Sequence, residues 1–166
     1  MKHKIERYAP PGINIHLEIR YYFTGLLCAF LYSMLFLIRY SNSLSKLYGW
    51  VGNNRVILPD AVMDDFYLIL DSCLLGFVII AVAVLFLIVY HYMYHYQGSK
   101  SIYLMKRLPN SRELHFRCIT LPLTGAVISM LLAIILLFAY YGIYIACTPK
   151  ECLTPGQWQK LWSVLL

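Results

Sequence analysis

The fold of this chain is decided by the stretch QGSKSIYLMKRLPNSRELHFRCITLPL, residues 97–123. Strongly apolar segments precede and follow it. Against the single acid Glu113, it carries five basic residues: Lys100, Lys106, Arg107, Arg112 and Arg117. Because Lys and Arg close to a membrane span resist translocation, a basic loop between two spans stays in the cytoplasm. The stretch therefore predicts the orientation of the whole chain.

The composition is that of an integral membrane protein. Of the 166 residues, 60% are hydrophobic and only 13% are charged, whereas charged residues make up about a quarter of a soluble domain. The formal net charge of +6 is concentrated in the 97–123 stretch and, more weakly, near the N-terminus. This pattern favours cytoplasmic retention of the basic loop over nucleic-acid binding, so no nucleic acid is expected as a partner.

Three apolar segments are long enough to cross a bilayer as helices, namely 21–38, 66–90 and 118–146. Tyrosines gather at their ends, as in the aromatic belts of membrane proteins. We therefore predict a single all-α membrane domain over 1–166, with three transmembrane helices in the plasma membrane. The N-terminus is expected in the cytoplasm and the C-terminus outside the cell.

Shorter amphipathic segments flank the spans. The alternating apolar residues of 13–20 fit a strand, but their position next to a span favours a short interfacial helix. At the other end, Thr154, Pro155 and Gln157 form a helix-start signature. We expect 155–166 to be a second interfacial helix, held in the outer leaflet by Trp158 and Trp162.

The basic loop, 97–117, has helical features of its own. Ile102, Met105 and Leu108 recur on one helical face, and Pro109 ends that helix at the residue before it. Asn110 and Glu113 then form a capping box for the next helix. The sequence predicts a short amphipathic helix, a corner, and a second helix that enters the membrane.

This arrangement resembles the coupling helix of type-2 ABC exporter permeases. In that family a few polar residues, an apolar turn and Leu-Pro-x-Ser/Thr-Arg follow the second span. The matching residues here are Ser101, Ile102, Leu104, Leu108, Pro109, Ser111 and Arg112. The resemblance covers only the first three spans of the family. It implies that the loop docks in a cleft of a separate ATP-binding subunit.

The expected docking element comprises the matching residues together with Met105, Lys106 and Arg107. Its apolar face has no core of its own to enter if the helix lies below the membrane, so helix-in-groove docking is expected. The alternative is that the same face lies on lipid headgroups, with the basic residues holding anionic lipid.

Two features inside the spans also stand out. Asp71 is the one charge of the second span, and Arg39 closes the outer end of the first. We expect the two to form a charge pair, the alternative being a substrate or proton role for Asp71. Gly25, Ala29 and Ser33, at four-residue intervals, form a stripe of small residues suited to close helix packing.

The outer segment, 41–65, is expected to be a loop that ends in a helix starting at Pro59 and Asp60. Cys147 and Cys152 could form a disulfide in an oxidising compartment, and this is left open. His91 and His95 share a helix face, but no third ligand follows in sequence, so they are assigned to an interface belt and no metal is expected.

No catalytic motif and no phosphate-binding glycine loop are present in the sequence. The chain is therefore not expected to be an enzyme or to hold a cofactor. Two functions remain. In the first, the chain is a permease-like exporter subunit that works with an ATP-binding partner and with a further membrane subunit or a second copy of itself. In the second, it is a small accessory protein that assembles with a larger membrane complex without forming a transport path.

Overall fold

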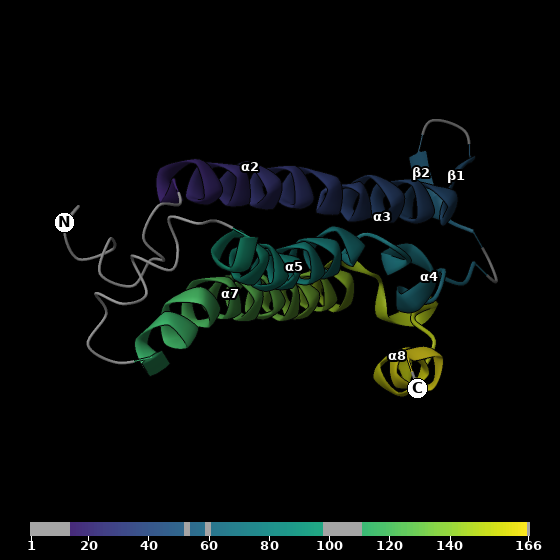
Figure 1. Ribbon diagram of the computed structural model, residues 1–166. Coiled ribbons are helices and arrows are strands. Elements are labelled where there is room, and N and C mark those ends of the chain that lie inside the picture. Colours follow the sequence, from purple (N-terminus) through teal and green to yellow (C-terminus); the bar gives the residue numbers. More distant parts are fainter. Residues whose placement is uncertain (1–13, 52–53, 59–60, 98–110, 166) are drawn as a thin grey trace. The chain divides into compact units, whose positions relative to one another are not determined.

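The computed structural model describes residues 14–51, 54–58, 61–97 and 111–165. Within this part of the chain, three helical segments are long and apolar enough to cross a membrane: Ile15–Lys46, Leu75–Tyr94 and Cys118–Cys147. Many of their large apolar side chains are exposed, as lipid-facing residues would be. The protein is a multi-pass membrane protein of the all-α class (Figure 1).

The helices fall into long and short elements. The long ones are α2 (Ile15–Ser33), α3 (Leu35–Lys46), α5 (Leu75–Gln97) and α7 (Ser111–Cys147). The short ones are α4 (Phe66–Leu70), the 3₁₀ helix η1 (Lys150–Cys152) and α8 (Gln157–Leu165). A single hairpin of β1 (Tyr48–Val51) and β2 (Asn54–Ile57) is also present.

The first span differs from the prediction. We expected a separate interfacial helix over 13–20, but α2 begins at Ile15 and runs without interruption to Ser33. The predicted division at residue 20 was wrong, because 15–33 contains no proline to end a helix there and a helix satisfies every backbone group inside a membrane. The chain turns once at Met34, whose N–H donates to the Leu31 carbonyl at 3.2 Å, before α3 continues the segment.

The second span is shorter than predicted, because 66–90 is not one helix. α4 ends at Leu70, a turn follows, and α5 begins only at Leu75. Asp71 lies at the break with φ of 35°, a conformation that non-glycine residues rarely adopt. The third span, predicted over 118–146, is part of the longer helix α7.

The outer segment also departs from expectation. Residues predicted as an irregular loop form an antiparallel hairpin, in which Tyr48 pairs with Ile57 and Trp50 with Arg55. The helix expected to start at Pro59 and Asp60 does not, since 61–65 are extended or irregular and α4 starts at Phe66. Asp64 and Asp65, which lie in this irregular stretch, instead bond with distant parts of the chain.

Contacts divide the chain into two compact units, and α2, α5 and α7 each contribute residues to both. Unit 1 combines the described residues up to Ala29 with Phe77–Ala133, and unit 2 combines Phe30–Gly76 with the residues from Ile134 onward. The core of unit 2 is aromatic: the rings of Phe36 and Tyr140 stack with centroids 4.5 Å apart, and Phe66 packs between them and Tyr144.

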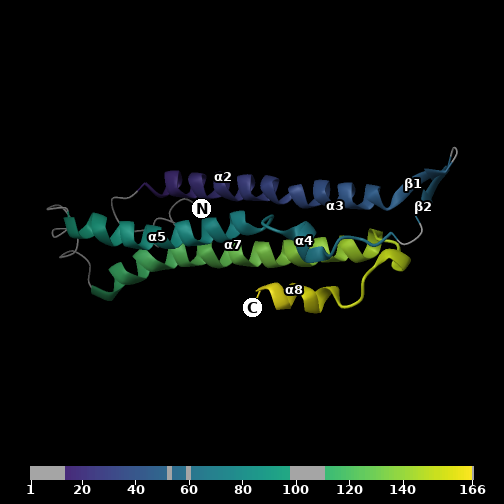
Figure 2. The same cartoon turned by 90° about the vertical axis from the view of Figure 1, so that its right-hand side faces the viewer.

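In unit 2, α8 folds back against α4 and the end of α7 (Figure 2). The Trp158 ring lies 5.7 Å from Phe138 and 5.0 Å from Tyr141, and Leu161 is buried. Trp162 remains about half exposed. The prediction placed the start of this helix at Pro155, whereas α8 itself begins at Gln157.

Candidate functional site

The predicted docking segment lies mostly outside the described residues. This applies to Ser101, Ile102, Leu104, Met105, Lys106, Arg107, Leu108 and Pro109, while Ser111 and Arg112 are the first two residues of α7. What the structure does describe is the base of the loop, where α5 ends and α7 begins.

Two contacts join α5 to α7 at the base of this loop. The Tyr92 hydroxyl lies 2.7 Å from His115 Nδ1, and His91 Nδ1 lies 3.4 Å from the carbonyl oxygen of Cys118. His91 is fully buried, whereas His115 is exposed. The helices that lead into and out of the loop are therefore tied together within unit 1.

Pro122 explains why the Cys118 carbonyl is available to His91. In an α-helix that carbonyl would accept the N–H of the residue four positions later, which is residue 122. Proline has no N–H, so Pro122 within α7 leaves the Cys118 oxygen without its helical partner. A buried carbonyl without a partner is costly, and the imidazole of His91 supplies the missing donor.

The same bond places a hydrogen on Nδ1 of His91, because a carbonyl oxygen can only accept. The other ring nitrogen, Nε2, lies 3.0 Å from Glu18 Oε1 on α2, so this contact joins α5 to α2.

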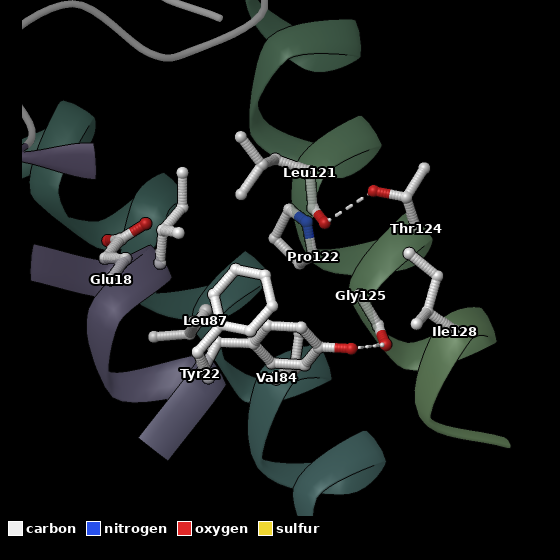
Figure 3. A pocket seen from close by; sticks show the side chains of 11 residues that line it. Glu18, Tyr22, Val84, Leu87, Leu121, Pro122, Thr124, Gly125 and Ile128 are labelled. Atoms are coloured by element: carbon white, nitrogen blue, oxygen red, sulfur yellow. Dashed lines mark hydrogen bonds between the residues drawn. The ribbon is translucent and has the colours of Figure 1, made fainter. Parts of the chain in front are cut away.

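An apolar groove of about 280 Å³ adjoins this pair. Side chains of α2, α5 and α7 line it, with Glu18 at one side and Leu121 and Pro122 opposite (Figure 3). The full lining consists of Glu18, Ile19, Tyr22, Phe23, Val84, Leu87, Leu121, Pro122, Thr124, Gly125 and Ile128. Of these residues only Glu18 is charged.

Tyr22 holds one wall of the groove in place. Its hydroxyl donates to the Gly125 carbonyl at 2.8 Å (Figure 3). The same hydroxyl lies 3.1 Å from that of the buried Ser129. At Gly125 a Cβ would lie 3.2 Å from Val84, which is a tight contact, and 3.6 Å from the Tyr22 ring, which is an ordinary one, so the glycine allows the close approach of α5. A hydrogen bond between α2 and α7 therefore forms one boundary of the groove.

The structure brings Arg39 and Asp71 together in unit 2. Arg39 Nη1 donates to Asp71 Oδ2 at 2.9 Å, and both side chains are substantially exposed. The hydrogen bond from Arg39 lowers the pKa of the Asp71 carboxyl below its ordinary value. Because both partners are exposed, this ion pair contributes little to stability.

The predicted small-residue stripe is distributed over both units. In unit 1, Ala29 is buried, and a Cβ placed on Gly25 would be in ordinary contact with Ile80, 3.7 Å away. In unit 2, Ser33 is fully buried and its hydroxyl lies 2.9 Å from that of Tyr140. Ser33 thus takes part in a hydrogen bond in addition to being small.

Asp65 forms the most extensive polar contact of unit 2. Its Oδ1 accepts from Lys160 Nζ, Gln157 Nε2 and Thr154 Oγ1, each at 2.8 Å. The bond from Lys160, supported by the other two, lowers the pKa of the Asp65 carboxyl. In return, Gln157 Oε1 accepts the Phe66 backbone N–H at 2.9 Å and so caps α4.

The cysteines and histidines form no further centre among the described residues. Cys147 is exposed and Cys152 is buried, and both are free thiols. No group of three or more His, Cys, Asp or Glu residues suited to a metal ion occurs in the part of the chain that the structure describes.

No family model, curated protein or solved structure matches this chain. The class of protein is therefore defined by its own residues: a multi-pass membrane protein with three candidate spans. Sequence reasoning missed the pairing of Glu18 with His91 and the role of Pro122. The one sequence feature that could have indicated this contact was the proline four residues after Cys118, since it leaves the Cys118 carbonyl without a helical donor.

Proposed function

We propose that the chain is a membrane-embedded, permease-like subunit of an ABC-type exporter. Residues 101–112 dock on a separate ATP-binding subunit in the cytoplasm. The observation that carries this proposal is the basic loop itself, with apolar residues at helical spacing and a Leu-Pro-x-Ser-Arg ending. Lys106, Arg107 and Arg112 frame the contact and speed encounter with an acidic surface.

The base of the loop supports this function mechanically. A docking element can pass a movement of its partner to the spans only if both ends of the loop are held. The contacts of Tyr92 with His115 and of His91 with the Cys118 carbonyl hold α5 and α7 together at this point. A shift of the loop therefore acts on two spans at once.

Three helices rarely enclose a conduit, so this function requires a further membrane subunit or a second copy of the chain. The exposed apolar side chains of α2, α5 and α7 provide surface for such packing. The chain itself hydrolyses no ATP under this proposal.

A second function is favoured by the character of unit 1. The groove is almost wholly apolar, and the polar groups Glu18, His91, Tyr22 and Ser129 bond with one another or with backbone. These features suit an accessory protein that assembles with a larger membrane complex without a transport path.

Met105→Glu separates these functions. A charge on the apolar face of the docking element should detach the ATP-binding partner in a detergent pull-down and remove substrate-stimulated ATP hydrolysis. The matched control, Met105→Leu, keeps the face apolar and should retain both.

If the complex survives Met105→Glu, or if no ATPase copurifies with the wild type, the exporter proposal is wrong and the accessory function takes its place. If the face instead lies on lipid headgroups, Met105→Glu weakens liposome binding and leaves the complex intact.

A further inference from the structure

We propose that the groove beside Glu18 binds a membrane lipid with an ammonium headgroup. The ammonium lies at the Glu18 carboxylate and one hydrocarbon chain lies along the apolar wall. Phosphatidylethanolamine has this chemistry. The proposal concerns unit 1 alone and does not depend on an ATP-binding partner.

The walls of the groove fit a hydrocarbon chain. Apart from Glu18, its lining consists of aliphatic and aromatic side chains, a proline, a glycine, a threonine and the ring of Tyr22. The hydroxyl of Tyr22 is turned to Gly125 and Ser129, and that of Thr124 donates to the Leu121 carbonyl at 2.9 Å (Figure 3). With these hydroxyls engaged, the wall offers an apolar surface, which suits contact with an acyl chain.

The position of Glu18 fits a headgroup. Glu18 lies in the first turn of α2, at the start of the first candidate span. Phe23, also in the lining, is five residues further along, or about 7.5 Å at the rise of an α-helix. A lipid with its headgroup at Glu18 therefore has its chain directed along α2 into the span.

Charge selects the headgroup. A carboxylate offers acceptor sites on two oxygens, and His91 lies at one of them, Oε1. An ammonium carries three donors and one positive charge, which complements this carboxylate. An anionic headgroup such as that of phosphatidylglycerol would meet the carboxylate with charge of the same sign.

The test is lipid binding to the purified full chain, measured by native mass spectrometry in detergent with phosphatidylethanolamine and phosphatidylglycerol of identical chains. Glu18→Gln should weaken phosphatidylethanolamine binding roughly tenfold, the effect of losing one charge-assisted hydrogen bond. Phosphatidylglycerol binding should not weaken, because the substitution removes a charge of the same sign as that headgroup. The matched control, Glu151→Gln, removes an exposed acid of unit 2 and should alter neither.

Equal phosphatidylethanolamine binding by the wild type and Glu18→Gln would overturn the proposal, as would an equal loss of both lipids. Ile128→Trp, which fills the groove without touching the carboxylate, should also weaken binding. If Glu18→Gln does not fold, the wild type decides: it should bind phosphatidylethanolamine more tightly than phosphatidylglycerol of identical chains. Equal affinity for the two lipids means that the carboxylate selects no headgroup.

Discussion

At the scale of single residues, one proline accounts for much of unit 1. Pro122 leaves the Cys118 carbonyl without a helical donor, His91 supplies one, and the second nitrogen of His91 is thereby directed at Glu18. A proline in a membrane helix is tolerated when a neighbour satisfies the freed carbonyl. Here the neighbour is an ionisable side chain, so the proline also determines how a buried acid is paired.

A double-mutant cycle tests this dependence. His91→Ala should lower the free energy of unfolding by roughly 3 kcal/mol, because the Cys118 carbonyl and the Glu18 carboxyl both lose a buried partner. In a Pro122→Ala background the loss should be smaller by about 1 kcal/mol, since the Ala N–H bonds to Cys118 within the helix. Reversible unfolding in detergent gives these energies. Strict additivity of the two changes contradicts the proposed link.

At the scale of elements, α4 and α8 depend on each other. The Asp65 side chain does not cap α4, although Asp65 is the residue before it. It bonds instead to the start of α8, and Gln157 of α8 caps α4. Trp158 of α8 also makes aromatic contacts with Phe138 and Tyr141 of α7. Short helices of this length are stable only through such tertiary contacts.

The lowered pKa of Asp65 makes the contact between α4 and α8 depend on pH, with a definite sign. The stabilisation by the ionised carboxylate is complete above the ordinary pKa of about 4 and is lost as the pH falls through the lowered value. Tryptophan emission of a Trp50→Phe variant, which keeps only Trp158 and Trp162, should shift to the red below pH 4 as α8 separates.

Asp65→Asn should show part of this shift already at pH 7, since loss of a charged hydrogen-bond acceptor costs about 1.5–3 kcal/mol. Its emission should respond less to acid than that of the parent. Glu151→Gln serves as the control and should titrate like the parent. An Asp65→Asn protein with the parent's emission and the parent's acid transition would show that the carboxylate does not hold α8.

At the scale of the whole molecule, we predict the arrangement in the membrane from three candidate spans and one basic loop. Three spans are expected to place the termini on opposite sides. The net positive charge of 97–123 favours the cytoplasm for this loop, and therefore the outside for the hairpin of β1 and β2.

Cysteine labelling from one side of the membrane tests the topology. In a background without the five native cysteines, a cysteine at Asn54 should react from outside and one at Ser99 only from inside. Asn54 is exposed in the hairpin, whereas Ser43 would be a poor reporter because it is buried and donates to Asp64 Oδ2 at 2.7 Å. The reverse pattern contradicts the topology and removes the proposed docking element from the cytoplasm.

The sequence by itself determined the class of the protein and the places of its spans. Hydrophobic length is a local property, so apolar runs identified all three membrane segments without knowledge of their neighbours. The same holds for Arg39 and Asp71, which stood out as charges at the ends of apolar runs. The docking element was likewise a local pattern of apolar spacing, basic residues and a Leu-Pro corner, and it stays a prediction.

Only the tertiary structure decided which polar groups meet. Glu18 and His91 are 73 positions apart, and Phe66 and Gln157 are 91 apart. Nothing local distinguishes His91 from the aromatic residues around it, because the rotation of one helix against another sets which side chains face inward. The break at Asp71 has the same cause: a helix that composition alone would continue is interrupted where Asp71 pairs with Arg39 of a different helix. Local composition fixes whether a segment lies in the membrane, but the partners of its polar groups depend on contacts between distant segments.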